Sequence, residues 1–147
     1  MNLTIDQQSG AIHISGIDVA IGKGMSKIDA SNALKPLFDR NRDHGNGYSW
    51  LCFSKVKFGL MPTSFNLCFL TDVLERITFS VALPNERLEQ NWPTRESSER
   101  EVKFVRLQLN AQIQYDLTTN QTEYPWGSVY SYFDEKGFMA ASGLHYS

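Results

Sequence analysis

The sequence lacks the features that mark an exported, membrane-spanning or metal-stabilised protein. It has only two cysteines, Cys52 and Cys68, which we interpret as reduced, buried small apolar side chains rather than a disulfide. The N-terminal residues show neither the cationic segment nor the apolar run of a signal peptide. No stretch approaches the roughly 18 apolar residues of a transmembrane helix. These absences predict a cytoplasmic protein that does not associate with membranes.

An excess of charge of either sign is also lacking. Lys and Arg number 14 and Asp and Glu number 16, so the formal net charge is −2. Proteins that bind a duplex normally show a clear basic excess, because neutralising phosphates supplies much of the affinity. We therefore expect no direct binding to nucleic acid.

Motifs for catalysis or cofactor binding are missing as well. The three histidines, His13, His44 and His145, do not stand at metal-ligand spacing. The turn Gly22-Lys23-Gly24 is a lone glycine pattern without the rest of a phosphate-binding motif, and no nucleophile elbow occurs. We expect no metal, no cofactor and no enzymatic activity.

The composition is that of an ordinary globular protein. Hydrophobic residues make up 41% and charged residues 20% of the 147 positions. A chain of this length is the usual size of one domain and buries roughly 70% of its unfolded surface. We therefore predict a single globular domain spanning residues 1–147.

Alternation of apolar and polar residues predicts an antiparallel sheet. The strands are expected at Leu3–Ile5, Ala11–Ser15, Tyr48–Phe58, Ser64–Leu70, Leu74–Leu83, Ser128–Asp134 and Phe138–Tyr146. The polar segment Asp39–Gly47 and the stretch before Ser128 are expected to be loops, and Gly137 is expected to supply a left-handed turn position. Within Tyr48–Phe58, one face is predicted to carry Tyr48, Trp50, Cys52, Val56 and Phe58.

Two helices are predicted from capping residues and helical spacing. Ser26 begins the first helix, which Pro36 should kink or end near Lys35. Its apolar stripe is Ile28, Ala33, Leu34, Leu37 and Phe38. The second helix, from about Arg95 to Tyr115 after the cap Thr94, buries Val102, Val105, Leu109 and Ile113. The fold class is therefore α+β: an antiparallel sheet with both helices on one face, in two halves that each run from helix to strands.

The aromatic C-terminal hairpin provides the candidate binding surface. In strand Ser128–Asp134, Tyr130 and Tyr132 point away from Val129, Ser131 and Phe133, so they lie on the open face if the other set faces the helices. Tyr and Trp are frequent at protein interfaces, although they also pack against helices. The predicted partner-binding residues are Tyr130, Tyr132, Asp134, Glu135, Trp126 and Asp43.

The order of these segments, "GMSKIDA", "YSW", "FNLCFLTDVLERITFSV", a Glu-rich helix and "YPWGSVYSYFDEKG", resembles small bacterial cytosolic immunity proteins of polymorphic and contact-dependent toxin systems. The resemblance covers most of the chain and rests on structural motifs. It implies a single-domain inhibitor that binds and blocks a cognate toxin domain, with a nuclease as one candidate, and we expect a monomer or weak dimer. Acidic loop groups would steer a basic partner.

An alternative is a small enzyme or ligand-binding domain. Its pocket would lie between helix and sheet and would use His44, Asp43 or Lys23. A metabolite that stabilises the folded state would favour this alternative.

Overall fold

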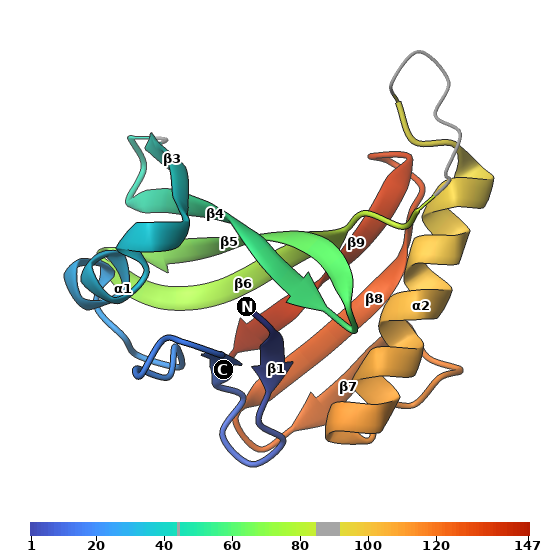
Figure 1. The fold of residues 1–147 in the computed structure, drawn as a ribbon, viewed down its shortest axis with the longest axis horizontal. Coiled ribbons are helices and arrows are strands. Elements are labelled where there is room, and N and C mark those ends of the chain that lie inside the picture. The colour runs from blue at the N-terminus through green and yellow to red at the C-terminus, as the bar shows by residue number, and fades with distance from the viewer. Residues whose placement is uncertain (44, 85–91) are drawn as a thin grey trace.

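The computed structural model describes residues 1–43, 45–84 and 92–147. Two α-helices, one 3-10 turn and nine strands occur in these ranges (Figure 1). In chain order they are β1 (Leu3–Ile5), β2 (Ile12–Ile14), α1 (Lys27–Ala33), η1 (Lys35–Leu37), β3 (Phe38–Asp43), β4 (Tyr48–Phe58), β5 (Met61–Leu70), β6 (Val73–Val81), α2 (Arg95–Ile113), β7 (Gln121–Tyr124), β8 (Gly127–Asp134) and β9 (Met139–Tyr146). His44 lies outside the described residues.

Seven strands form one antiparallel sheet in the order β3-β4-β5-β6-β9-β8-β7, and β1 pairs with β2 in a separate hairpin. The pairing of β6 with β9 joins the strands that follow α1 to those that follow α2. The predicted α+β class, with two helices and an antiparallel sheet, is confirmed, and the sequence of helix then strands occurs twice.

One face of the sheet carries the core. Buried side chains of α1, α2 and the β1–β2 hairpin belong to one cluster with the strands β4, β5, β6, β8 and β9. In α2 the predicted residues Val102, Val105, Leu109 and Ile113 are all buried, and the helix runs beside β8 and β9 (Figure 1). Thr94 caps α2 as predicted, with Ser97 completing a capping box.

Trp126, which was predicted as a contact residue, lies in this core. The residue is 6% exposed, and its indole stacks on Tyr124 and donates from Nε1 to the carbonyl of Gln7 at 2.8 Å. A Cβ at Gly10 would lie 2.3 Å from the indole ring, so only glycine fits beneath it. Trp126 therefore fixes the N-terminal hairpin against the C-terminal strands.

Two edge strands were missed by the sequence reading. β3 covers Phe38 and the first five residues of the predicted loop Asp39–Gly47, and β7 lies in the predicted loop before Ser128. All six residues of β3 are exposed, so this strand has no alternation of apolar and polar residues to reveal it. Edge strands of this polar kind resist pairing with other chains.

A β-bulge in β4 overturns the predicted single face. The pairing with β5 shifts between Phe53 and Val56, and Lys55 has a φ of 69°. Because the bulge adds a residue, the core receives Leu51 and Phe53 before it and Val56 and Phe58 after it. The predicted partners of Val56 and Phe58, namely Tyr48, Trp50 and Cys52, lie on the opposite face.

Two local predictions are also wrong. Ile28 was predicted in the buried stripe of the first helix but is 74% exposed. This short helix instead buries Ala30, together with Leu34, which directly follows the helix. The turn between β8 and β9 has its positive φ at Phe138 (53°) and not at Gly137.

Candidate functional site

The face of the sheet opposite the core is called the open face here. Directly paired residues in an antiparallel sheet project to the same side, so the register defines its rows. One row is Arg42, Trp50, Cys68, Arg76, His145 and Ser128. The next is Arg40, Cys52, Asn66, Thr78, Gly143 and Tyr130.

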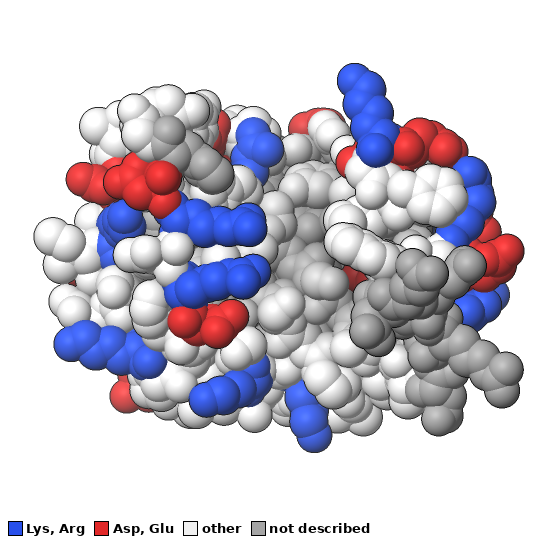
Figure 2. Space-filling view, turned by 90° about the horizontal axis from the view of Figure 1, so that it is seen from above, with Lys and Arg blue, Asp and Glu red and all other residues white. Residues whose placement is uncertain are grey.

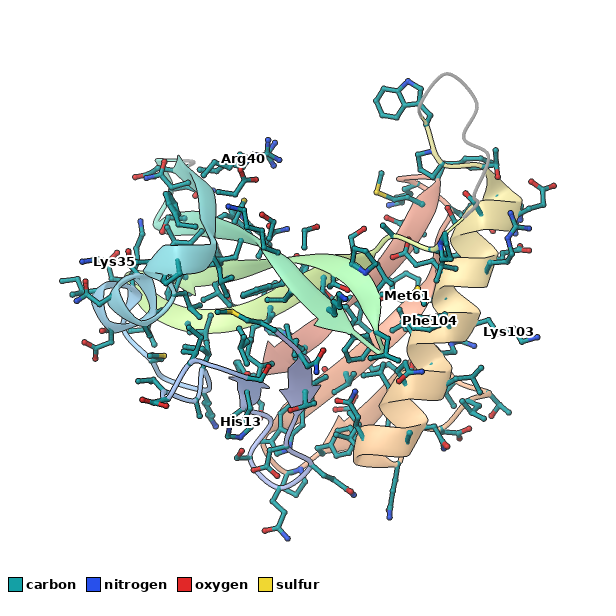
Figure 3. The ribbon with its side chains drawn as sticks, viewed as in Figure 1. His13, Lys35, Arg40, Met61, Lys103 and Phe104 are labelled. Atoms are coloured by element: carbon teal, nitrogen blue, oxygen red, sulfur yellow. The ribbon has the colours of Figure 1, made fainter. Side chains whose placement is uncertain are left out.

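The open face forms a hollow. Seen from above, it lies between two raised parts of the molecule, and Lys and Arg side chains gather along the wall on the side of β3 and β4 (Figure 2). Arg40 extends from β3 toward the middle of the molecule (Figure 3). A concave surface of this kind can enclose a protruding segment of another molecule.

Tyr130 forms part of the floor of this hollow. A Cβ at Gly143 on β9 would lie 2.7 Å from the Tyr130 hydroxyl oxygen, so the missing side chain lets the tyrosine lie across β9. Burial raises the pKa of Tyr130, while the positive charge of Arg76 lowers it. The Tyr132 ring lies beside it, with 5.9 Å between the ring centroids. Both tyrosines are half-buried and occupy the face opposite Val129 and Ser131, as the strand alternation predicts.

Three arginines contribute cations to the open face. Among the described residues, no acidic side chain forms an ion pair with Arg40, Arg42 or Arg76. The Nε of Arg76 and Oε2 of its neighbour Glu75 are buried without hydrogen-bond partners in the described part of the chain. Buried polar atoms of this kind are costly unless something completes their hydrogen bonds.

The other predicted contact residues do not form one cluster. Glu135 accepts two hydrogen bonds from Arg95, at 3.0 and 3.3 Å, and Arg95 lies 4.5 Å above the Phe133 ring. These contacts tie the β8–β9 turn to the start of α2. Asp134 accepts from the backbone of Lys136 within that turn. Asp43 ends β3, which is the first strand in the sheet order, whereas β8 is the sixth.

Asp43 also points away from the open face. It pairs with Ser49, whose parity is that of the core residue Leu51, while Arg42 pairs with Trp50. The sheet therefore separates Asp43 from Tyr130 and Tyr132. Sequence reasoning did not group Arg40, Arg42, Trp50 and Arg76 with the two tyrosines, because their shared face follows only from the register.

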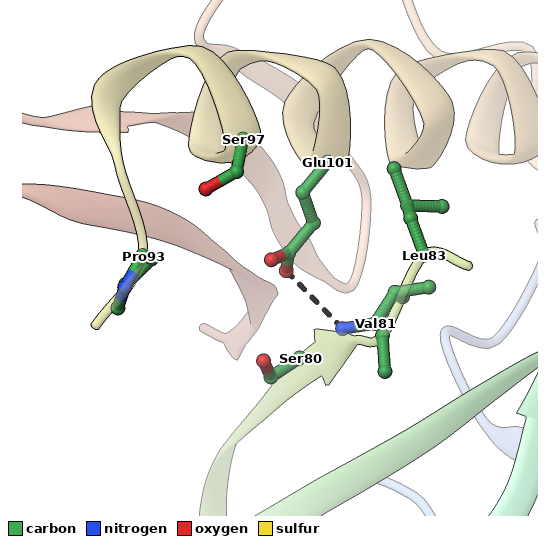
Figure 4. Close-up of a pocket in the computed structure, with 7 residues that line it drawn as sticks. Ser80, Val81, Leu83, Pro93, Ser97 and Glu101 are labelled. Atoms are coloured by element: carbon green, nitrogen blue, oxygen red, sulfur yellow. Dashed lines mark hydrogen bonds between the residues drawn. The ribbon is translucent and has the colours of Figure 1, made fainter. Parts of the chain in front are cut away.

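A second hollow lies between α2 and the end of β6 (Figure 4). Its volume is about 310 Å³, and Ser80, Ser97 and Glu101 contribute its polar groups. The Glu101 carboxylate accepts a hydrogen bond from the Val81 N–H at 3.1 Å. Burial raises the pKa of Glu101 to about 7, and the Val81 hydrogen bond opposes that rise. This carboxyl can therefore change its charge near neutral pH.

No metal-binding group of three His, Cys, Asp or Glu side chains is found in residues 1–43, 45–84 and 92–147. Within the same ranges, no helix has the length and apolar character that crossing a membrane requires. Both cysteines are buried and free, and burial raises the pKa of the Cys68 thiol.

The fold has a counterpart among solved structures. A chain in the structure "Rhs1-CT in complex with cognate immunity protein RhsI1" superimposes with a TM-score of 0.54 at 13% sequence identity. The match covers 98% of this chain and 86% of that chain. No family model and no curated protein matches the sequence. The chain therefore shares its fold with a component of an immunity complex, and at this identity the likeness concerns the fold alone.

The close approach at Gly143 gives a stability prediction. Gly143→Ala should destabilise the protein by about 2–3 kcal/mol, because overpacking forces backbone shifts and the new Cβ would lie 2.3 Å from the Ile77 carbonyl oxygen. Urea denaturation measures this loss. Gly22→Ala is the control, since its Cβ would meet nothing nearer than Ala11 at 3.2 Å. Equal stability of the two variants would contradict the proposed packing.

Glu101 gives a prediction about pH. Because its pKa rises on folding from 4.5 to about 7, the folded state favours the protonated carboxyl. The contribution of this group to the free energy of unfolding is fully present below pH 4.5. It decreases by about 3 kcal/mol as the pH rises to 7 and above. Glu101→Gln keeps an acceptor for Val81 and should remove this decrease in urea denaturation between pH 5 and 8.

The exposed Glu96 in the first turn of α2 supplies the matched control. Glu96→Gln should retain the decrease of stability between pH 5 and 8. An unchanged pH dependence in Glu101→Gln would show that this carboxyl is not the source.

Proposed function

We propose that this chain is a non-enzymatic binding protein of the immunity class, which binds and neutralises a cognate protein toxin domain. The open face carries the proposal, because it presents half-buried aromatic side chains and arginines that have no ion-pair partners among the described residues. The fold likeness to a chain of an immunity complex supports it.

The chemistry of the open face suits protein recognition. Trp, Tyr and Arg are the residue types that most often dominate the energy of protein interfaces. Trp50, Tyr130 and Tyr132 are half-buried, so they already have restricted side-chain freedom and lose little more on binding. When a segment of the toxin lies in this hollow, the chain would neutralise the toxin by covering its active site or substrate groove.

Neutralisation tests this proposal in cells. The protein encoded immediately upstream should arrest growth when expressed alone, and this chain should restore growth and copurify with it. Growth arrest by this chain itself would assign it to the toxic side of the pair. If the neighbouring product neither arrests growth nor binds, the proposal fails.

The tyrosine pair gives a direct mutational prediction. Tyr130→Ala with Tyr132→Ala should weaken partner binding by about 100-fold or more, as loss of interface aromatics does. The decrease in unfolding free energy should be smaller than the decrease in binding free energy, because both tyrosines are half-buried on the open face. Calorimetric titration and urea denaturation measure the two quantities on the same samples.

Tyr124→Ala is the matched control for these tyrosines. Tyr124 stacks on Trp126 and donates its hydroxyl to the Ile113 carbonyl at 2.8 Å, on the helix side of the sheet. This variant should lose stability and keep its affinity. If instead the double variant loses several kcal/mol of stability, the two tyrosines are core residues and the site is wrong.

The hollow beside Glu101 supports a second candidate function, ligand binding between helix and sheet. A thermal-shift screen with metabolites tests it, since a ligand that binds only the folded state raises the melting temperature. A large shift that Glu101→Gln abolishes would favour this second function over the immunity role.

A further inference from the structure

Strand β3 separates its charges by face. Arg40 and Arg42 pair with Cys52 and Trp50, so both cations project over the open face. Asn41 and Asp43 pair with Leu51 and Ser49 and project to the other side. Although β3 contains both acidic and basic residues, it therefore presents two arginines to the hollow.

The floor of the hollow adds a third arginine. Arg76 lies in the same row as Arg42, Trp50 and Cys68, and its Nε is buried without a hydrogen-bond partner in the described residues. Glu75 and His145 flank it, with 3.4 Å between His145 Nε2 and Glu75 Oε1. The guanidinium is thus held in place by the sheet and still has bonding capacity that nothing described uses.

We propose that the open face binds an acidic segment of the partner protein, an inference that rests on the immunity function proposed above. Carboxylates of this segment pair with Arg40 and Arg42 on the wall and with Arg76 on the floor. The rings of Trp50, Tyr130 and Tyr132 pack against its apolar atoms. The planar fork of arginine suits this role, because it binds a carboxylate through two parallel hydrogen bonds.

This partner has the opposite charge from the one that the acidic loops suggested. Two of the acidic groups behind that expectation are occupied or turned away, since Glu135 pairs with Arg95 and Asp43 faces the other side. Arg40 and Arg42 face the hollow from β3, and neither forms an ion pair with another described residue. Steering at the wall should therefore favour negative surfaces.

A protein segment fits this face better than a nucleic acid does. The register places Asp134 and Glu123 on the same face as Tyr132 and Ser128, and Glu75 lies beside Arg76. These carboxylates would repel a continuous row of phosphates, whereas separate carboxylates can avoid them. The net charge of −2 also disfavours a polyanion.

Charge reversal at the wall tests this inference. Arg40→Glu with Arg42→Glu should raise the Kd for the neighbouring-gene protein by about 100-fold or more, because like charges would then oppose each other. The fold should be unaffected, since every side chain of β3 is exposed. The matched control is Lys35→Glu with Lys103→Glu, two exposed lysines on η1 and α2 that give the same change in net charge.

Three measurements separate the outcomes: the Kd for the neighbouring-gene protein, the dependence of wild-type binding on NaCl, and the preference between an oligonucleotide and an acidic peptide. Binding by the wild type and control, with loss in the arginine variant and weaker wild-type binding in 0.5 M than in 0.05 M NaCl, supports the inference. Equal binding by all three proteins overturns the inference and leaves the immunity function standing. No binding by the wild type overturns the immunity function itself. The wild type could instead bind a twelve-residue oligothymidylate more tightly than a hexaglutamate peptide. If reversal of the two arginines abolishes that binding, the face is assigned to nucleic acid.

Discussion

Burial of one face of the seven-stranded sheet is the constraint on which the rest of the structure depends. The helices and the N-terminal hairpin all contribute to the cluster on that face. The sheet twists and its strands change register, yet the core receives apolar side chains along the length of β4, β5 and β6. The bulge at Lys55 shows the strength of this constraint, because a non-glycine residue adopts a φ of 69° so that Val56 and Phe58 stay in the core.

The same constraint leaves the opposite face free to carry polar and aromatic groups. Side chains there need not form a dry core, so arginines can stand next to Trp50 and Tyr130 without ion-pair partners among the described residues. Gly143 shapes this face by letting Tyr130 lie flat. A rigid sheet therefore holds the candidate contact groups in fixed positions, which limits the entropy that binding costs.

Local patterns in the sequence predict much of this fold. The stripe of α2, the cap Thr94 and the bounds of β4 follow from residues that are neighbours along the chain. The strand β3 and the change of face within β4 do not, because an exposed edge strand has no apolar alternation and a bulge has no fixed sequence signal. The alternation of Tyr130 and Tyr132 is visible in the sequence, whereas the rows that join them to Arg76 and Arg40 depend on strand order. Trp126 is of a residue type that is common at interfaces, and its burial and its hydrogen bond to Gln7, which depend on the tertiary fold, show that it is internal.

Hydroxyl-radical footprinting of the complex tests most directly the claim that the open face is the functional surface. The free protein should be oxidised at Trp50 and Tyr132, and at Ile28, which is 74% exposed on α1. On complex formation with the neighbouring-gene protein, oxidation of Trp50 and Tyr132 should fall while that of Ile28 stays unchanged. Protection of Ile28 with no change at Trp50 and Tyr132 would contradict the account.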